Sequence, residues 1–197
     1  MFKRIASLAL AALIVGTTTS CILDPDKKPP VVDKPTLDYK PLTEEWHVLH
    51  NMELAYDNRD INRYAELFDG DNFVFFFNPD DVGVDGIPSQ WNYDAEIGSA
   101  RNMFNRIPGT QNLSITGIDL ILADNKIEET FWEDTTLPDE FPGETLRQAT
   151  VTYNFSIDTN SEKTYIAPQT VVPRAQFILR EIDGKFKIVR WFDLLVQ

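Results

Sequence analysis

The chain has 197 residues, of which 43% are hydrophobic and 12% aromatic, and it carries a formal net charge of −13. This size and composition suit one globular domain plus a short appendage, and the acidity argues against binding nucleic acid or anionic lipid headgroups through bulk charge. One cysteine excludes an internal disulfide, and with only two histidines no ordinary Cys/His metal cluster can be assembled, so we expect neither a metal nor a cofactor.

Residues 1–20 have the pattern of a secretory signal peptide. Lys3 and Arg4 precede an apolar run over residues 5–15, and small residues follow as far as Ser20. The apolar run is short for a membrane-spanning helix, which needs about 20 apolar residues.

The only cysteine, Cys21, directly follows this segment. The arrangement resembles a bacterial lipoprotein signal, in which the cysteine is lipidated and becomes the first residue of the mature protein, although Thr18 stands where such signals usually carry an aliphatic residue. Ordinary cleavage that leaves a free thiol is the alternative, but an exposed lone thiol is disfavoured in an oxidising compartment. Because Ile22 rather than Asp follows the cysteine, the resemblance implies anchoring in the outer membrane.

Residues 21–41 contain five prolines among Asp and Lys residues, which favours an extended tether between the anchor and a domain over residues 42–197.

A first helix is predicted from Thr43, whose hydroxyl would cap it. Its apolar residues recur at helical spacing: Val48, Leu49, Met52, Ala55 and Tyr56. His47 and His50 lie three residues apart without an HExxH pattern, so we interpret them as solvent-facing or capping side chains rather than a ligand pair.

Asp60 caps a second predicted helix, along which apolar residues again repeat at helical spacing: Ile61, Tyr64, Ala65 and Phe68. Residues 69–71 end it, and residues 72–77 read as a buried strand. The nearby aspartates lack an EF-hand pattern, so they indicate turns rather than a calcium site: Asp69, Asp71, Asp80 and Asp81.

Residues 83–91 are a predicted loop, after which Asn92 or Asp94 caps a third helix. Its stripe contains Ile97, Ala100, Phe104 and Ile107, with Met103 beside it, and Pro108-Gly109 ends it. Trp91 either roofs a pocket or staples the helix entry.

Strands follow from residue 112, with a bulge at Gly117 and a hairpin arm over residues 127–132. An acidic loop over residues 133–143 leads to the longest β-prone run, residues 145–157, and a further strand covers residues 165–172. Four apolar residues of the long run share one face: Val151, Tyr153, Phe155 and Ile157.

The chain closes on a predicted hairpin over residues 174–195 that turns at Asp183-Gly184. A two-residue loop would place Arg180 opposite Lys187, whereas a three-residue loop pairs Glu181 with Lys185, and we favour the latter. Phe177 and Leu179 mark one face, and the other face carries Ile178, Ile188 and Phe192. The hairpin is therefore expected to be covered on both sides.

This element order, ending in Asp-Gly-Lys-Phe-Lys-Ile-Val-Arg-Trp-Phe-Asp, resembles the nuclear transport factor 2-like superfamily, which includes SnoaL-like proteins, over residues 42–197. The resemblance implies an α+β cone in which three N-terminal helices pack in a strongly curved antiparallel sheet around an apolar cavity. The superfamily includes isomerases, dehydratases, polyketide cyclases, transport factors and pocketed proteins without known activity, so fold does not decide function.

Within such a cavity the best-placed acid is Asp193, two residues after Trp191 and therefore on the same face of its strand. Burial among aromatic side chains raises a carboxyl pKa, which suits a proton-abstracting base, with Tyr56 or another tyrosine as its partner. The pocket candidates are Tyr56, Tyr64, Trp91, Met103, Arg190 and Trp191, with Tyr153 as a further source of a hydroxyl. Structural roles remain the alternative for each, including an ion pair between Asp193 and Arg174.

The leading hypothesis is a lipid-anchored cell-envelope protein whose pocketed domain binds a small molecule or an envelope protein. The alternative is an isomerase, dehydratase or cyclase that uses Asp193. An enclosed cavity in which Asp193 and a tyrosine hydroxyl converge favours the enzyme, whereas a core filled by phenylalanines favours an interaction module. Homodimerisation through the outer face of the sheet is a third interpretation, for which exposed Tyr153 or Phe155 would be the sign. A cationic partner is a further alternative because the chain is acidic.

Overall fold

The structure is a computed structural model that describes residues 37–105, 115–160, 164–166 and 172–194. The predicted signal peptide, Cys21, most of the tether and the Pro108-Gly109 helix end lie outside the described residues. Leu37–Gln197 forms one compact unit. No helix in the described ranges is long and apolar enough to cross a membrane.

The domain combines short helices with a long-stranded sheet. The helices are α1 (Glu45–Asn58), α2 (Ile61–Ala65) and α3 (Tyr93–Phe104), and the 3₁₀ turns are η1 (Val84–Gly86), η2 (Ala123–Asn125) and η3 (Ile127–Glu129). The strands are β1 (Val74–Phe76), β2 (Gln90–Asn92), β3 (Ile115–Leu122), β4 (Glu133–Thr135), β5 (Leu146–Thr159), β6 (Thr164–Ile166), β7 (Arg174–Ile182) and β8 (Lys185–Leu194). This composition confirms the predicted α+β class.

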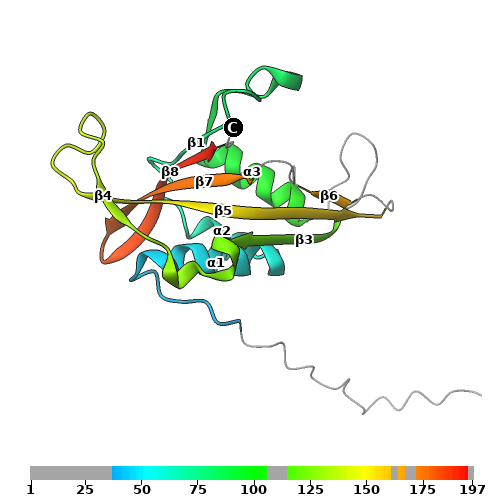
Figure 1. Cartoon of the computed structure of the whole chain (residues 1–197), viewed down its shortest axis with the longest axis horizontal. Coiled ribbons are helices and arrows are strands. Elements are labelled where there is room, and N and C mark those ends of the chain that lie inside the picture. The colour runs from blue at the N-terminus through cyan, green and yellow to red at the C-terminus, as the bar shows by residue number, and fades with distance from the viewer. Residues whose placement is uncertain (1–36, 106–114, 161–163, 167–171, 195–197) are drawn as a thin grey trace, which may run out of the picture. The chain divides into compact units, whose positions relative to one another are not determined.

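The strands form one sheet in the order β2-β1-β8-β7-β5-β3, with β4 and β6 also paired to β5. All pairs are antiparallel except β1 with β8. In Figure 1 the long strand β5 crosses the domain, with α1 and α3 on either side of it in this view. The pairing of the closing hairpin with β1 and β5 places β7 and β8 in the middle of the sheet.

The helices pack on the inner face of the sheet. One continuous cluster of buried side chains joins Val48 of α1, Tyr64 of α2 and Ile97 of α3 to Phe177 of β7 and Ile188 of β8. The helices therefore share their core with the closing hairpin rather than packing only among themselves, as predicted for the cone.

The side-chain caps predicted at the helix N-termini are confirmed for α2 and α3 but not for α1. The Asp60 carboxylate accepts a hydrogen bond from the Arg63 N–H at 3.1 Å, and Asn92 caps α3 through the Ala95 N–H at 3.1 Å. The cap of α1 is Glu44 rather than Thr43, and no side chain caps it.

The solvent-facing role predicted for His47 is wrong. Its side chain is buried against the ring of Trp46, with ring centroids 4.2 Å apart. His50 is half-buried and hydrogen-bonds the carbonyl of Asp38 at 3.1 Å. In the described part of the chain, no three His, Cys, Asp or Glu side chains are grouped to hold a metal ion.

The three-residue loop favoured for the closing hairpin is also wrong. Ile182 pairs with Lys185, so the loop consists of Asp183 and Gly184, whose φ angles are 52° and 72°. Positive φ at both positions is the type I′ geometry that matches the twist of two-residue hairpins.

The repulsion between Arg180 and Lys187 that argued against this register is reduced, because each side chain binds an acceptor in another segment. Arg180 lies opposite Lys187, but its guanidinium donates to both Glu144 oxygens at 2.7 and 2.8 Å and also reaches Asp69 at 3.3 Å. The Lys187 ammonium donates to the Glu66 carbonyl. These acceptors belong to segments far away in the chain, so they could not be seen when the two hairpin strands were considered alone.

A register shift in the hairpin corrects one face assignment. Ile178 pairs with Arg190 and Leu179 with Ile188, so Val189 is the extra residue of a bulge. Ile188 consequently joins Leu179 in the inner core, and Val189 takes the outer position predicted for Ile188.

The outer face of the hairpin is covered by the segment between β4 and β5, as the two-sided apolar pattern predicted. Phe141 of this segment packs with Ile178 and Val189 in a second buried cluster. Arg190 is buried there, pairs with Glu140 and lies over the Phe141 ring.

Other boundaries differ from the predictions. The predicted arm over residues 127–132 is instead η3 followed by the short strand β4, and the predicted loop over residues 83–91 contains η1 and ends in β2. The predicted bulge is present, because the register of β3 shifts between Ile115 and Gly117.

The free edge of β3 is covered by a side chain of α1 and by that of Arg59, which directly follows the helix. Glu53 accepts a hydrogen bond from the Leu122 N–H, and Arg59 donates to the Thr116 carbonyl at 2.7 Å. Burial, and then the charges of Asp57 and other nearby acids, raise the pKa of Glu53 to about 7, although the Leu122 N–H opposes the rise. The contact protects a sheet edge but places a desolvated carboxyl there.

Candidate functional site

The inner face of the sheet does not close completely on the helices. A cavity of about 270 Å³ lies between β5, β7, β8 and β1 on one side and α1 and α3 on the other. Its lining residues are Tyr56, Phe75, Trp91, Glu96, Ser99, Ala100, Met103, Leu120, Leu122, Tyr153, Phe155, Ala175, Trp191 and Asp193. Ser99 is exposed and Met103 half-buried, so this side of α3 connects the cavity to solvent.

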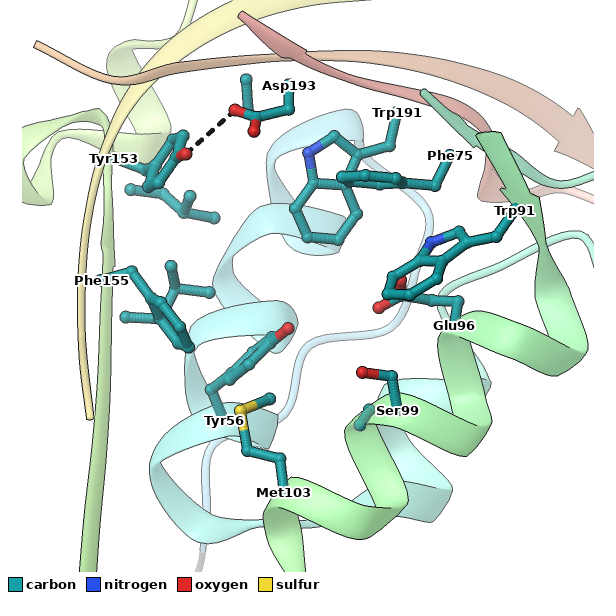
Figure 2. Close-up of a pocket in the computed structure, with 14 residues that line it drawn as sticks. Tyr56, Phe75, Trp91, Glu96, Ser99, Met103, Tyr153, Phe155, Trp191 and Asp193 are labelled. Atoms are coloured by element: carbon teal, nitrogen blue, oxygen red, sulfur yellow. Dashed lines mark hydrogen bonds between the residues drawn. The ribbon is translucent and has the colours of Figure 1, made fainter. Parts of the chain in front are cut away.

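Aromatic rings form most of the wall, and they hold one another in place. Phe75 contacts Trp191 edge-on at 5.1 Å between ring centroids and lies 5.6 Å from Trp91. Across the cavity, Tyr56 contacts Phe155 edge-on at 5.8 Å. Figure 2 shows these rings around an open space. Such rigid apolar walls suit a flat or compact apolar ligand.

One end of the cavity carries a carboxyl and a phenol in direct contact. Tyr153 donates a hydrogen bond to Asp193 at 3.0 Å (Figure 2). Burial raises the pKa of Asp193, the Tyr153 hydroxyl opposes that rise, and the charge of Asp81 adds to it. Burial, and then the charge and hydrogen bond of Asp193, also raise the pKa of Tyr153.

The sheet register brings these two side chains together. Ala175 of β7 pairs with Asp193 of β8 on one side and with Val151 of β5 on the other. Tyr153 is two residues further along β5 and therefore lies on the same face. Because the intervening residue is an alanine, the tyrosine can reach diagonally across β7 to the aspartate.

A second carboxyl, Glu96 of α3, lies on the opposite wall. It is 5% exposed, and the Tyr64 hydroxyl donates to it. The Tyr64 and Tyr56 hydroxyls lie 3.3 Å apart and extend this polar network towards the cavity. Burial raises the pKa of Glu96, whereas the Tyr64 hydroxyl and the Trp91 indole N–H favour its charged form.

The Trp91 indole N–H is buried beside Glu96, yet it makes no hydrogen bond of good geometry to any described residue (Figure 2). The indole N–H therefore favours the ionised carboxyl through its partial positive charge and not through a well-formed hydrogen bond. Burial and the nearby Glu96 charge also raise the pKa values of Tyr56 and Tyr64. A buried acid with tyrosine donors can hold or release a proton as its surroundings change.

Six of the site candidates named from the sequence line this cavity: Tyr56, Trp91, Met103, Tyr153, Trp191 and Asp193. Tyr64 is fully buried behind the wall and reaches the site through Glu96. Arg190 does not line the cavity, because it lies on the outer face with Glu140. Asp193 bonds Tyr153, and no ion pair joins it to Arg174 in the described structure.

The sequence interpretation missed Glu96 and Ser99. A usable signal existed for Glu96, because it precedes Ala100 by four residues and Phe104 by eight and so lies on the apolar stripe of α3. Tyr153 and Phe155 face the cavity and do not supply the exposed outer patch expected for a dimer.

Comparisons with known proteins identify the fold. No protein-family model and no curated protein matches the chain. A candidate scytalone dehydratase from Novosphingobium aromaticivorans DSM 12444 is similar in structure, with a TM-score of 0.52 and 12% identity over 76% of this chain and 80% of that one.

Two further solved structures are similar at lower scores. Hexachlorocyclohexane dehydrochlorinase LinA type 2 has a TM-score of 0.48 and 8% identity over 76% of this chain and 81% of that one. ActVI-ORFA from Streptomyces coelicolor has a TM-score of 0.46 and 13% identity over 75% of this chain and 91% of that one. The fold of this chain is the nuclear transport factor 2-like cone, as the resemblance in its sequence implied.

Proposed function

We propose that this domain of nuclear transport factor 2-like fold binds a small, largely apolar molecule in the cavity between its sheet and helices. The observation that carries the proposal is a 270 Å³ space with aromatic walls that is left open in an otherwise close-packed core. Polar groups enter it at defined places, at Asp193 with Tyr153 and at Glu96. Apolar walls with a few convergent polar groups are typical of ligand pockets.

Saturation-transfer NMR with neutral aromatic fragments, indole and benzyl alcohol, tests this proposal. Ala175→Leu places a large side chain between Tyr153 and Asp193 and should abolish the transfer signal. Ala95→Leu makes the same change at an exposed position of α3 and should leave the signal intact. Equal signals from both variants would show that the fragments bind elsewhere.

A second candidate function is acid–base catalysis of the isomerase, dehydratase or cyclase type. It is favoured by the contact of Asp193 with Tyr153 inside an apolar cavity, where burial raises the carboxyl pKa towards the range of a general base. Several superfamily members catalyse such reactions, and the neighbour from Novosphingobium aromaticivorans is a candidate scytalone dehydratase.

In this second candidate, Asp193 would take a proton from a carbon atom of the bound molecule, and Tyr153 would hold the carboxylate in place. The test is to incubate any compound that co-purifies with the protein in D2O with the wild type and with Asp193→Asn. Deuterium incorporation that needs Asp193 would support catalysis. Binding without any exchange would leave the domain a binding module.

For the location of the domain, we propose a cell-envelope protein anchored through a lipid on Cys21. The support is the signal-like segment that ends at the only cysteine, followed by a proline-rich stretch. Mass spectrometry of the N-terminal peptide from native protein should find a diacylglyceryl group on Cys21. An unmodified thiol at the mature N-terminus would refute the anchor without affecting the pocket.

A further inference from the structure

The charges that face the cavity are all of one sign in the described structure. Its lining includes two carboxyls, Asp193 and Glu96, and no Lys, Arg or His side chain among the described residues. Neither carboxyl forms an ion pair within the described part of the chain. Asp81 adds negative potential at Asp193. The cavity therefore presents uncompensated negative potential in an apolar setting, where charge interactions are stronger than in water.

Two other acids near the sheet are paired with a cation. Asp69 is buried and Glu144 is half-buried, and both contact the guanidinium of Arg180. Glu53 at the edge of β3 is different again, because it forms no ion pair in the described part of the chain and lies near other acids. Asp193 and Glu96 differ from these acids because their carboxyls line an apolar cavity.

The walls add a second attraction for positive charge. Trp91, Trp191, Tyr56 and Tyr153 all line the space, and Trp and Tyr rings bind cations at their faces. Phe75 completes the group on the side of the two tryptophans. A cation with an apolar body would gain contact with these rings and with a carboxylate at the same time.

We propose that the ligand of this cavity is a cation, an amine or quaternary ammonium compound with a compact apolar or aromatic body, and that its charged end pairs with Asp193. This inference rests on the proposed binding function and specifies its ligand class.

Asp193 is the better partner of the two acids for geometric reasons. It is half-buried and accepts one described hydrogen bond, on Oδ1 from Tyr153, so its other oxygen is available to a ligand. Glu96 is 5% exposed and already accepts from Tyr64. We assign Glu96 a supporting role as a second negative charge at the cavity wall.

Three probes of similar size separate charge from apolar burial: benzylamine, benzyl alcohol and benzoate. At neutral pH they carry a positive charge, no charge and a negative charge. Quenching of tryptophan fluorescence reports binding, because Trp91 and Trp191 line the cavity. We expect benzylamine to bind about tenfold more tightly than benzyl alcohol, a difference of about 1.4 kcal/mol, because its ammonium forms a charge-assisted hydrogen bond where the alcohol forms a neutral one. Benzoate should bind most weakly.

Two variants locate the charge effect. Asp193→Asn keeps the size of the side chain and should lower the affinity for benzylamine about tenfold while leaving that for benzyl alcohol nearly unchanged. Asp71→Asn removes the same charge from an exposed turn and should change neither. A parallel loss in Asp71→Asn would mean that bulk charge, not the cavity, attracts the amine.

The outcomes distinguish the two proposals. Benzyl alcohol or benzoate binding as tightly as benzylamine would overturn the cationic ligand class and leave the apolar pocket standing. Tighter binding of benzylamine that survives Asp193→Asn would overturn the assignment of Asp193. Failure of all three probes to bind would overturn the cationic ligand and the proposed pocket together.

Discussion

Replacing Tyr64 with Phe tests the buried network behind the cavity. Tyr64 is fully buried, and its hydroxyl donates to the Glu96 carboxyl and lies 3.3 Å from the Tyr56 hydroxyl. Phenylalanine keeps the ring and its contacts with Phe68 and Phe104 but removes the donor. The change therefore isolates one hydrogen bond to an acid rather than creating a cavity.

The expected loss depends on the charge of Glu96. A hydrogen bond to an ionised group contributes about 2 kcal/mol and one between neutral groups about 1 kcal/mol. Burial raises the pKa of Glu96 above its ordinary 4.5, and the Tyr64 hydroxyl holds that rise back. Removing the hydroxyl raises the pKa of Glu96 further, so the folded variant binds its proton more tightly than the wild type. The destabilisation should accordingly grow as pH rises through the raised folded-state pKa of Glu96.

Urea unfolding followed by circular dichroism at about pH 5 and about pH 8 measures this effect. Combining Tyr64→Phe with Glu96→Gln completes a double-mutant cycle, in which we expect a coupling of about 1 kcal/mol at the higher pH. Tyr39→Phe is the matched control, because the Tyr39 hydroxyl is buried without a hydrogen-bond partner among the described residues, and its loss should be nearly neutral. Equal destabilisation by Tyr64→Phe at both pH values and in both backgrounds would refute the proposed link to the Glu96 charge.

Three further substitutions test the fold. Glu53→Gln should stabilise the protein by about 1 kcal/mol at pH 8, after allowance for solvent screening, and by little at pH 4.5. The reason is that a folded-state pKa of about 7 makes ionised Glu53 unfavourable at the higher pH. Urea unfolding measures this, and the exposed Glu181→Gln is the control, which should leave the free energy of unfolding nearly unchanged at both pH values. Phe141→Ala should cost about 3 kcal/mol by opening the outer cluster and increase dye binding to exposed apolar surface, and wild-type stability would contradict that role. Gly184→Ala should lower the free energy of unfolding by about 1 kcal/mol, because the residue has a φ of 72°. Gly98→Ala should raise it by about 0.5–1 kcal/mol, because an added Cβ meets no neighbouring atom in α3. Thermal unfolding measures both, and a change of the same sign in both variants would contradict this reasoning.

The features that could be predicted from the sequence depend on neighbours in the chain. Asp60 and Asn92 cap helices through N–H groups three residues ahead, and the Gly117 bulge and the long strand β5 follow from local patterns. The closing hairpin was located by Asp183-Gly184 for the same reason. Its register was not, because Glu144 and Glu66, which separate the two like charges, belong to distant segments.

The site was predicted only in part because its contacts are long-range. Asp193 could be placed on the Trp191 face by alternation along one strand, but its partner Tyr153 is 40 residues away and depends on the register of β7 between them. Glu96 and Tyr64 are 32 residues apart and meet only when α2 packs against α3. Arg190 was included among pocket candidates because nothing in the sequence shows that the segment around Phe141 folds over the outer face.

The acids of this domain differ in how their surroundings affect the ionised form. Arg180 lowers the pKa of Glu144 by a direct hydrogen bond, which stabilises the fold when the acid is charged. Asp193 and Glu96 show the opposite effect, since burial raises the pKa of both and each ionised form opposes folding. Neutral side chains of the same shape should therefore stabilise the domain at pH 8, as expected for Glu53. The proposed cationic ligand would offset the cost of burying these two charges when it occupies the cavity.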